Sequence, residues 1–172
     1  IPPSVLRWLA ACPAEESVAL LLRHSVRAPL PPEDVGYMLP ITEAGAKLGR
    51  ELGRMLGRRL RSLRSSPLAR CLQTAEALRG GAGADLPIVS DRLLGDPGVY
   101  VIDERLAWTQ WQTLGHEGVM RHLVSSNHAL PGMAQASEAA LSLVHHMLSS
   151  AEGAPGIHVF VTHDYQGLPR RC

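Results

Sequence analysis

The chain has 172 residues, of which 45% are hydrophobic and 19% charged. These values are typical of a single globular domain with a substantial core rather than of a disordered segment. The formal net charge of +1 argues against a protein that binds nucleic acid or a membrane surface through bulk charge. No signal peptide or membrane-spanning run is visible. Cys12, Cys71 and Cys172 are odd in number and lack metal-type spacing, which favours a reducing compartment and hence the cytoplasm.

The first third of the chain predicts a helix, a strand and a second helix. We expect, in order, a short helix, a buried strand and a proline-rich loop over residues 3–11, 17–22 and 30–40. Thr42 then has the chemistry of a helix N-cap, and apolar residues recur at helical spacing as far as Leu60. Gly49, Gly53 and Gly57 are spaced by four residues, which allows one face of this helix to pack closely against a neighbour.

The rest of the chain alternates strands with helices. The expected elements are a strand over 61–65, a helix from Ser66-Pro67 to Gly80-Gly81, a strand over 87–89, a helix over 134–150 and a strand over 158–162. Residues 92–132 form an insertion or cap with a helix near 116–126. The alternation predicts one domain over 1–172 in the α/β class, a three-layer α/β/α sandwich around a mostly parallel sheet. Such sheets bind ligands at the carboxyl ends of their strands.

The run from Arg23 to Arg27 follows the first strand and places His24 between two arginines. Two permanent cations nearby favour the neutral imidazole over the imidazolium. A neutral imidazole is a nucleophile, and the guanidiniums of Arg23 and Arg27 can grip an anion through forked hydrogen bonds. The run therefore predicts an anion site that contains a nucleophilic histidine.

Two further segments lie at the ends of expected strands. Arg70 is near the start of the helix after the second strand, where the free backbone N–H groups and the helix dipole favour a phosphate. His163 and Asp164 follow the last strand. Because the carboxyl ends of parallel strands meet at one edge, we expect His24, Arg70 and His163 in one site.

Three motifs occur in the order found in the histidine phosphatase superfamily, which includes phosphoglycerate mutases and histidine acid phosphatases. They are Arg23-His24, the segment from Ser66-Pro67-Leu68 through Arg70 to Gln73-Thr74-Ala75, and Thr162-His163. The resemblance spans about residues 18–164 and implies a phosphoglycerate mutase-like fold and a metal-independent phosphatase without a cofactor. It implies that His24 attacks phosphorus and becomes a phosphohistidine, which water then hydrolyses. Arg23, Arg27, Arg70 and His163 would hold the phosphoryl oxygens in the transition state.

The general acid is open among three carboxyl groups. Asp164 comes first, because His163-Asp164 and the Arg-His-Ser-x-Arg-x-Pro run resemble the acid phosphatase branch. Its carboxyl group would have to stay protonated in a cationic site, which works against it. Asp96 and Glu104 are the alternatives, since the mutase-like branch takes its acid from about this position.

The chain departs from the family pattern in two places. Ser25 replaces the usual glycine after the histidine, and a serine is small enough to be tolerated there. Residues 167–172 follow the last motif directly, whereas the family usually continues with a helix and often a strand. We therefore expect either that the chain is truncated or that the N-terminal segment covers the neighbouring sheet edge.

The expected substrate is a phosphorylated small molecule or a phosphoprotein, with specificity set by residues 30–40 and 92–132. Two alternatives to the phosphatase are a phosphomutase of the same superfamily and a non-catalytic module that binds phosphate. The substrate itself and the oligomeric state are left open by the sequence. His145-His146 is not expected to bind a metal, because adjacent helical residues point in different directions; one should be exposed and the other partly buried.

Overall fold

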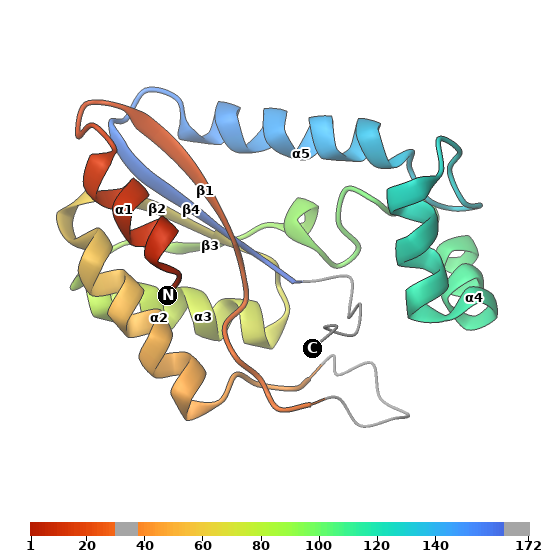
Figure 1. Ribbon diagram of the computed structural model, residues 1–172, viewed down its shortest axis with the longest axis horizontal. Helices are drawn as coiled ribbons and strands as arrows, with labels where there is room; N and C mark the ends of the chain where they lie inside the picture. Colours follow the sequence, from red (N-terminus) through yellow and green to blue (C-terminus); the bar gives the residue numbers. More distant parts are fainter. Residues whose placement is uncertain (30–37, 164–172) are drawn as a thin grey trace.

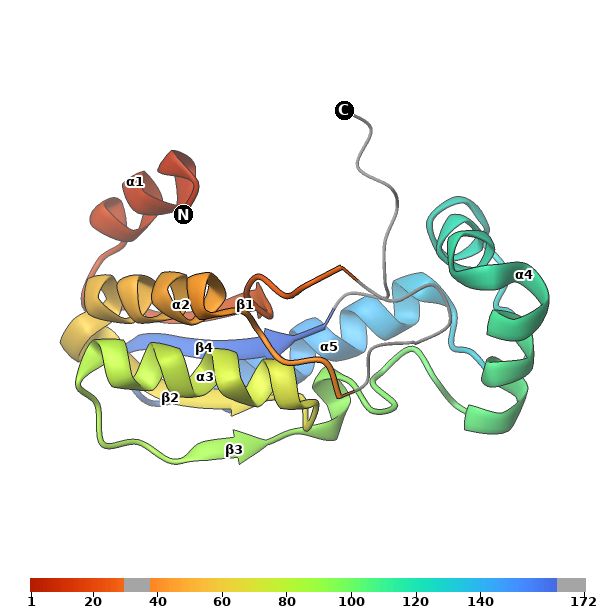
Figure 2. The same ribbon diagram turned by 90° about the horizontal axis from the view of Figure 1, so that it is seen from below.

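A computed structural model describes residues 1–29 and 38–163 of the chain. Its sheet contains β1 (Ser17–Arg23), β2 (Leu60–Ser65), β3 (Ile88–Ser90) and β4 (Gly156–Thr162), all parallel, in the spatial order β1-β4-β2-β3. Helices α2 (Glu43–Leu56) and α3 (Ala69–Ala82) cover one face, and α5 (Ala136–Ala151) covers the other (Figures 1 and 2). The predicted three-layer α/β/α sandwich with a parallel sheet is therefore confirmed.

The last strand in the sequence lies in the middle of the sheet. Every residue of β4 before Thr162 is buried, as expected for an apolar, β-branched strand that is covered on both faces. On one side Val159 and Val161 join a core with α3 and β2, and on the other Phe160 packs against Met147 of α5. The leading helix α1 (Pro3–Ala11) adds Leu9 to the first of these cores. This central strand carries His163 at its carboxyl end.

Helices α2 and α3 approach each other through two of the three predicted glycines, Gly49 and Gly53; the third, Gly57, follows the end of α2, and a Cβ there would meet no atom within 4 Å. Thr42 caps α2 as expected, since its Oγ1 accepts a hydrogen bond of 3.1 Å from the N–H of Gly45. A Cβ atom on Gly49 would lie 2.8 Å from the Cβ of Ala77, and one on Gly53 would lie 2.1 Å from the carbonyl oxygen of Leu78. The two helix backbones are in direct contact, and α3 is fixed relative to α2.

The bounds of α3 differ from the sequence prediction at both ends. The helix begins at Ala69 after an extended Leu68, so Ser66 and Pro67 lie in the connection from β2 and not in the first turn. It continues through Gly81, because this residue faces α2: a Cβ there would lie 2.0 Å from the carbonyl oxygen of Arg50. Gly83, with φ of 62°, ends the helix in the left-handed conformation.

We expect Gly53→Ala to lower the free energy of unfolding by about 2 kcal/mol, although alanine is the better helix former by about 1 kcal/mol. The added Cβ would overlap a backbone carbonyl, so α2 and α3 must separate. Gly80→Ala is the matched control, because that position on α3 has no atom within 4 Å of the added Cβ. Urea unfolding should show Gly80→Ala to be neutral or stabilising; equal destabilisation by both changes would contradict the close packing.

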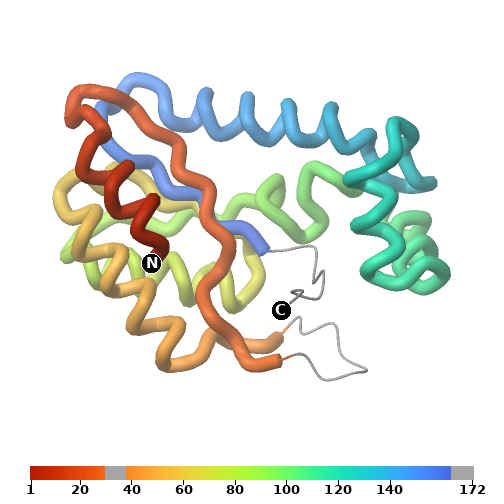
Figure 3. The backbone as a smooth tube through the Cα atoms, in the orientation of Figure 1, coloured from red at the N-terminus to blue at the C-terminus, as the bar shows by residue number. Residues whose placement is uncertain are grey.

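Most of the segment between β3 and α5 lies at one end of the molecule, beyond the sheet (Figure 3). Its main element is α4 (Glu104–Ser125), which is interrupted at Gly115, where φ is 66°. The predicted helix near 116–126 matches only the second half of α4, and the first half was missed. Ala107, Val119 and Met133 form a small core here with Trp111 packed against it. No helix in the described part of the chain is long and apolar enough to cross a membrane.

Candidate functional site

The carboxyl edge of the sheet brings together residues from three strands. The N–H of His24, directly after β1, donates to the carbonyl oxygen of Thr162 at 2.8 Å, and Arg23 pairs with Thr162 in the parallel register. On the other side of β4, the N–H of Ser66 donates to the carbonyl oxygen of Val161 at 2.9 Å. His24, His163 and Ser66 therefore follow three adjacent strands and lie at the same edge, as the sequence predicted for the two histidines.

His24 is buried, with 3% of its surface exposed, and its ring contacts the backbone of the next residue. Its Nδ1 lies 2.8 Å from the carbonyl oxygen of Ser25. A carbonyl oxygen only accepts hydrogen bonds, so we assign the proton of the neutral ring to Nδ1. The lone pair is then on Nε2, which is the nitrogen that would act as a nucleophile.

Ser25, which stands where the family has glycine, is held through both its backbone and its side chain. Its N–H donates to Oγ1 of Thr74 at 2.9 Å, and its Oγ donates to the carbonyl oxygen of Gly45 at 2.8 Å. The hydroxyl of Thr74 in turn donates to the carbonyl oxygen of Arg70 at 2.7 Å. Thr74 thus joins the loop that carries His24 to the helix that carries Arg70.

The three arginines of the predicted site differ in exposure. Arg70 lies in the first turn of α3 and is only 2% exposed, whereas Arg23 is exposed and Arg27 is half-buried. The side chain of Arg27 donates from Nη1 to the carbonyl oxygen of Ala28 at 2.9 Å. A buried guanidinium is costly unless it faces negative charge or acceptors. Arg70 is therefore the most buried of the three arginines, and its guanidinium needs acceptors or negative charge around it.

His163 follows β4 and packs against the turn after β3. A Cβ built on Gly95 would lie 2.1 Å from Cε1 and 2.3 Å from Nδ1 of His163, so the ring occupies the space that glycine leaves. The same turn is bonded to β4 and to Ser66. The Oγ1 of Thr162 donates to the carbonyl oxygen of Leu94 at 2.5 Å, and Ser66 Oγ donates to that of Gly95 at 3.4 Å.

The three candidate general acids lie in different parts of the chain. Asp164 lies outside the described residues. Asp96 directly follows Gly95. The φ of Asp96 is 70°, and its carbonyl oxygen accepts a hydrogen bond of 2.7 Å from Nε of Arg92. Glu104 begins α4, is 71% exposed and pairs with the same arginine at 3.7 Å. Of the two described candidates, Asp96 directly follows the glycine that contacts His163, whereas Glu104 is the first residue of α4.

The titratable residues that the structure describes around the sheet do not form a metal cluster. Within 1–29 and 38–163, no group of three or more His, Cys, Asp or Glu side chains could hold a metal ion. His145 is exposed and His146 partly buried, as expected from the sequence. His146 instead contacts Asp91, with 2.7 Å between Nε2 and Oδ2.

Comparison with solved structures identifies the fold. A mycobacterial glucosyl-3-phosphoglycerate phosphatase is 20% identical over 84% of this chain and 73% of its own, with a TM-score of 0.51. Its complex with inorganic phosphate gives 19% identity, coverage of 84% and 72%, and a TM-score of 0.53. The product of an open reading frame of Mycobacterium tuberculosis is 21% identical over 83% of this chain and 72% of its own, with a TM-score of 0.50. No protein-family model and no curated protein sequence matches the chain.

These structures share the phosphoglycerate mutase-like arrangement of a parallel sheet between helices. The chain therefore has the same fold as these structures, in agreement with the phosphoglycerate mutase-like fold that its sequence predicted. At this level of identity the likeness concerns the fold, and the chemistry must be argued from the residues at the carboxyl edge of the sheet.

Proposed function

We propose that the chain is a metal-independent phosphatase that hydrolyses phosphomonoesters through a phosphohistidine on His24. One observation carries the proposal: a buried histidine with Nδ1 directed to a carbonyl oxygen lies at the same sheet edge as His163, and Thr74 joins its loop to the buried Arg70. Guanidinium and imidazole groups supply the positive charge that a phosphoryl group requires. The shared fold with a mycobacterial phosphatase supports this assignment.

The proposed reaction has two steps. In the first, the lone pair of His24 Nε2 attacks phosphorus while the bond to the leaving oxygen breaks, and a general acid protonates that oxygen. In the second, the same carboxylate takes a proton from water, whose oxygen attacks phosphorus and breaks the N–P bond. Arg23, Arg27, Arg70 and His163 stabilise the charge on the transferring oxygens in both steps.

The general acid is proposed from the same three carboxyl groups as before. Asp164 is the first choice on the resemblance of its motif. Asp96 is the better placed of the two described alternatives, because the neighbouring Gly95 contacts His163, and Glu104 ranks below it. Single Asn or Gln variants at the three positions should separate them. The variant of the true acid should lose much less activity on an aryl ester with a good leaving group than on an alkyl ester.

The test of the function is hydrolysis of a generic aryl phosphate in the presence of a chelating agent. We expect inorganic phosphate to be released at the same rate with and without the chelating agent. A screen of phosphorylated metabolites and phosphopeptides would then identify the best substrate. Tight phosphate binding without turnover on any of these would contradict the phosphatase and favour a binding module. Phosphoryl transfer between positions of a sugar phosphate or glycerate, faster than hydrolysis, would favour a mutase.

Thr74 provides a test of how the site is held together. We expect Thr74→Val to lower the free energy of unfolding by about 1–3 kcal/mol, because the N–H of Ser25 loses its acceptor. Turnover of the aryl phosphate should fall as well, and Thr74→Ser should keep both the stability and the turnover of the unmodified chain. Thr109→Val is the control, because the Thr109 hydroxyl makes the same bond to the residue four positions earlier, but at an exposed position of α4. Chemical denaturation and aryl phosphate turnover are the measurements, and equal effects at both positions would contradict a special role for Thr74.

A further inference from the structure

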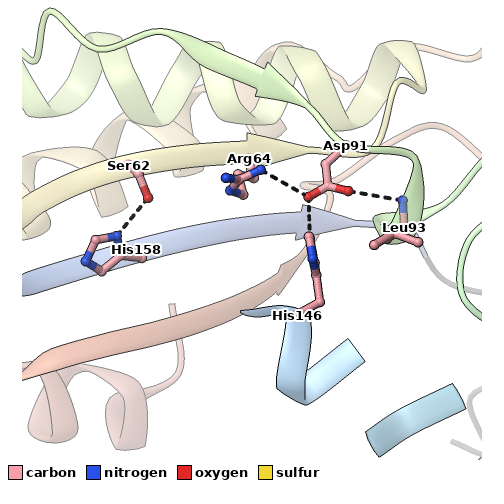
Figure 4. A network of polar contacts seen from close by, with 6 residues as sticks. All are labelled: Ser62, Arg64, Asp91, Leu93, His146 and His158. Carbon is pink, nitrogen blue, oxygen red and sulfur yellow. Dashed lines mark hydrogen bonds and ion pairs between the residues drawn. The ribbon is translucent and has the colours of Figure 1, made fainter. Parts of the chain in front are cut away.

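Asp91 is a buried carboxylate at the carboxyl end of β3 that the proposed mechanism does not use. It is 7% exposed. Its Oδ2 lies 2.7 Å from Nε2 of His146 on α5 and 3.6 Å from Nη1 of Arg64 on β2. Its Oδ1 accepts a hydrogen bond of 3.1 Å from the N–H of Leu93 (Figure 4). The carboxylate therefore joins α5, β2 and the segment that follows β3.

This segment is the turn that contacts His163. Asp91 caps the short 3-10 helix η2 (Arg92–Leu94), and its own N–H donates to the carbonyl oxygen of Ser65 at 2.8 Å. Leu94 is buried against Met147, the neighbour of His146 on α5. We call residues 91–95 the β3 turn. Its beginning is held by the Asp91 contacts, and its end is Gly95.

The end of the β3 turn determines where the ring of His163 can lie. The contact is tight, because a single added carbon on Gly95 would overlap the ring. The carbonyl oxygens of Leu94 and Gly95 also accept bonds from Thr162 and Ser66, so the turn is linked to the residue before His163 and to the end of β2. A shift of the β3 turn would consequently move His163 relative to His24.

The Asp91–His146 contact is expected to fix the position of the β3 turn more than it stabilises the fold. Replacing a buried polar contact of this kind by packed apolar groups is often neutral for stability, because the cost of desolvating the polar partners offsets their attraction. The two carboxylate oxygens of Asp91, however, point at fixed partners on two different elements, Leu93 in η2 and His146 in α5. An apolar pair of the same volume would not fix the turn in this way.

We propose that Asp91 and His146 are positioning residues that hold the β3 turn against His163 and so set the geometry of the phosphoryl site. The effect on the position of His163 does not depend on the reaction. The effect on turnover rests on the proposed function.

The first test follows the imidazole signals of His163 by NMR in His146→Leu, His146→Gln and Asp91→Asn, using a His163→Asn sample for assignment. We expect His146→Leu and the isosteric Asp91→Asn to shift these signals, and His146→Gln, which keeps an N–H donor, to restore them. Ser62→Ala is the control, since it removes a 2.8 Å bond between Ser62 on β2 and His158 on β4, farther from the carboxyl edge (Figure 4). Unchanged signals in the folded variants, or an equal shift in the control, would overturn the proposal.

The second test measures whether the pair acts through His163. We expect His146→Leu to lower kcat on an aryl phosphate on the order of tenfold, with His146→Gln close to the unmodified chain. In a His163→Ala background the same change should lower kcat by less than about twofold, because the group it positions is gone. An equal loss in both backgrounds would overturn the proposal. No turnover in the unmodified chain would contradict the phosphatase instead, while the NMR result would still decide the positioning role.

Discussion

Replacing His24 by alanine is expected to lower turnover of an aryl phosphate on the order of 10⁴-fold or more, because the nucleophile of the first step is removed. The variant should still fold. The backbone bonds from this loop to Thr162 and to Thr74 do not involve the imidazole and would remain. Steady-state kinetics on purified protein, with circular dichroism to confirm folding, is the measurement.

The control for His24 is His145→Ala, which removes an exposed histidine from α5. It should leave kcat and KM unchanged. Undiminished turnover in the His24 variant would remove the basis for the covalent mechanism. Added imidazole that restores part of the activity to His24→Ala would support it further, because a free ring could then act in place of the missing side chain.

Arg70→Ala is expected to lower kcat/KM by on the order of 10²–10³-fold, because it removes the buried guanidinium that we propose binds the phosphoryl oxygens. Arg70→Lys should recover only part of this, since one ammonium group cannot make the forked contact of a guanidinium. Arg79→Ala is the control. Arg79 lies on the same helix α3, but its side chain donates to the carbonyl oxygen of Leu86, so this variant should keep its activity.

Phosphate binding gives a readout of Arg70 that is independent of turnover. A ligand that binds only the folded state raises the melting temperature, and the increase grows with the ratio of ligand concentration to Kd. Inorganic phosphate should therefore stabilise the unmodified chain and Arg79→Ala, and have little effect on Arg70→Ala. Equal stabilisation of all three proteins would show that phosphate binds somewhere other than the Arg70 site.

Much of the sheet and its carboxyl edge could be predicted because local patterns determine them. The apolar run before Arg23 and the β-branched run before His163 are both strands, and the histidines follow them directly. The spacing of Gly49 and Gly53 correctly indicated the close contact of α2 and α3. Periodicity and strand ends are properties of neighbouring residues, so a single sequence contains them.

The parts that were missed depend on contacts between distant residues. Asp91 and His146 are separated by 55 positions and meet only because α5 packs across the sheet. The space that Gly95 leaves for His163, and the second bond of the Thr74 hydroxyl, likewise exist only in the folded chain. The end of α3 was misplaced because Gly81 looked like a helix terminator, whereas its lack of a side chain serves the contact with α2.

The most direct test of the account is to identify the residue that carries phosphate during turnover. The protein is mixed with an aryl phosphate, quenched in alkali, in which phosphohistidine survives, and digested for mass spectrometry. We predict a phosphoryl group on His24 that is lost in acid, in the unmodified chain but not in His24→Ala. A phosphoryl group on another residue, or steady turnover with no modified His24 at any quench time, would contradict the account.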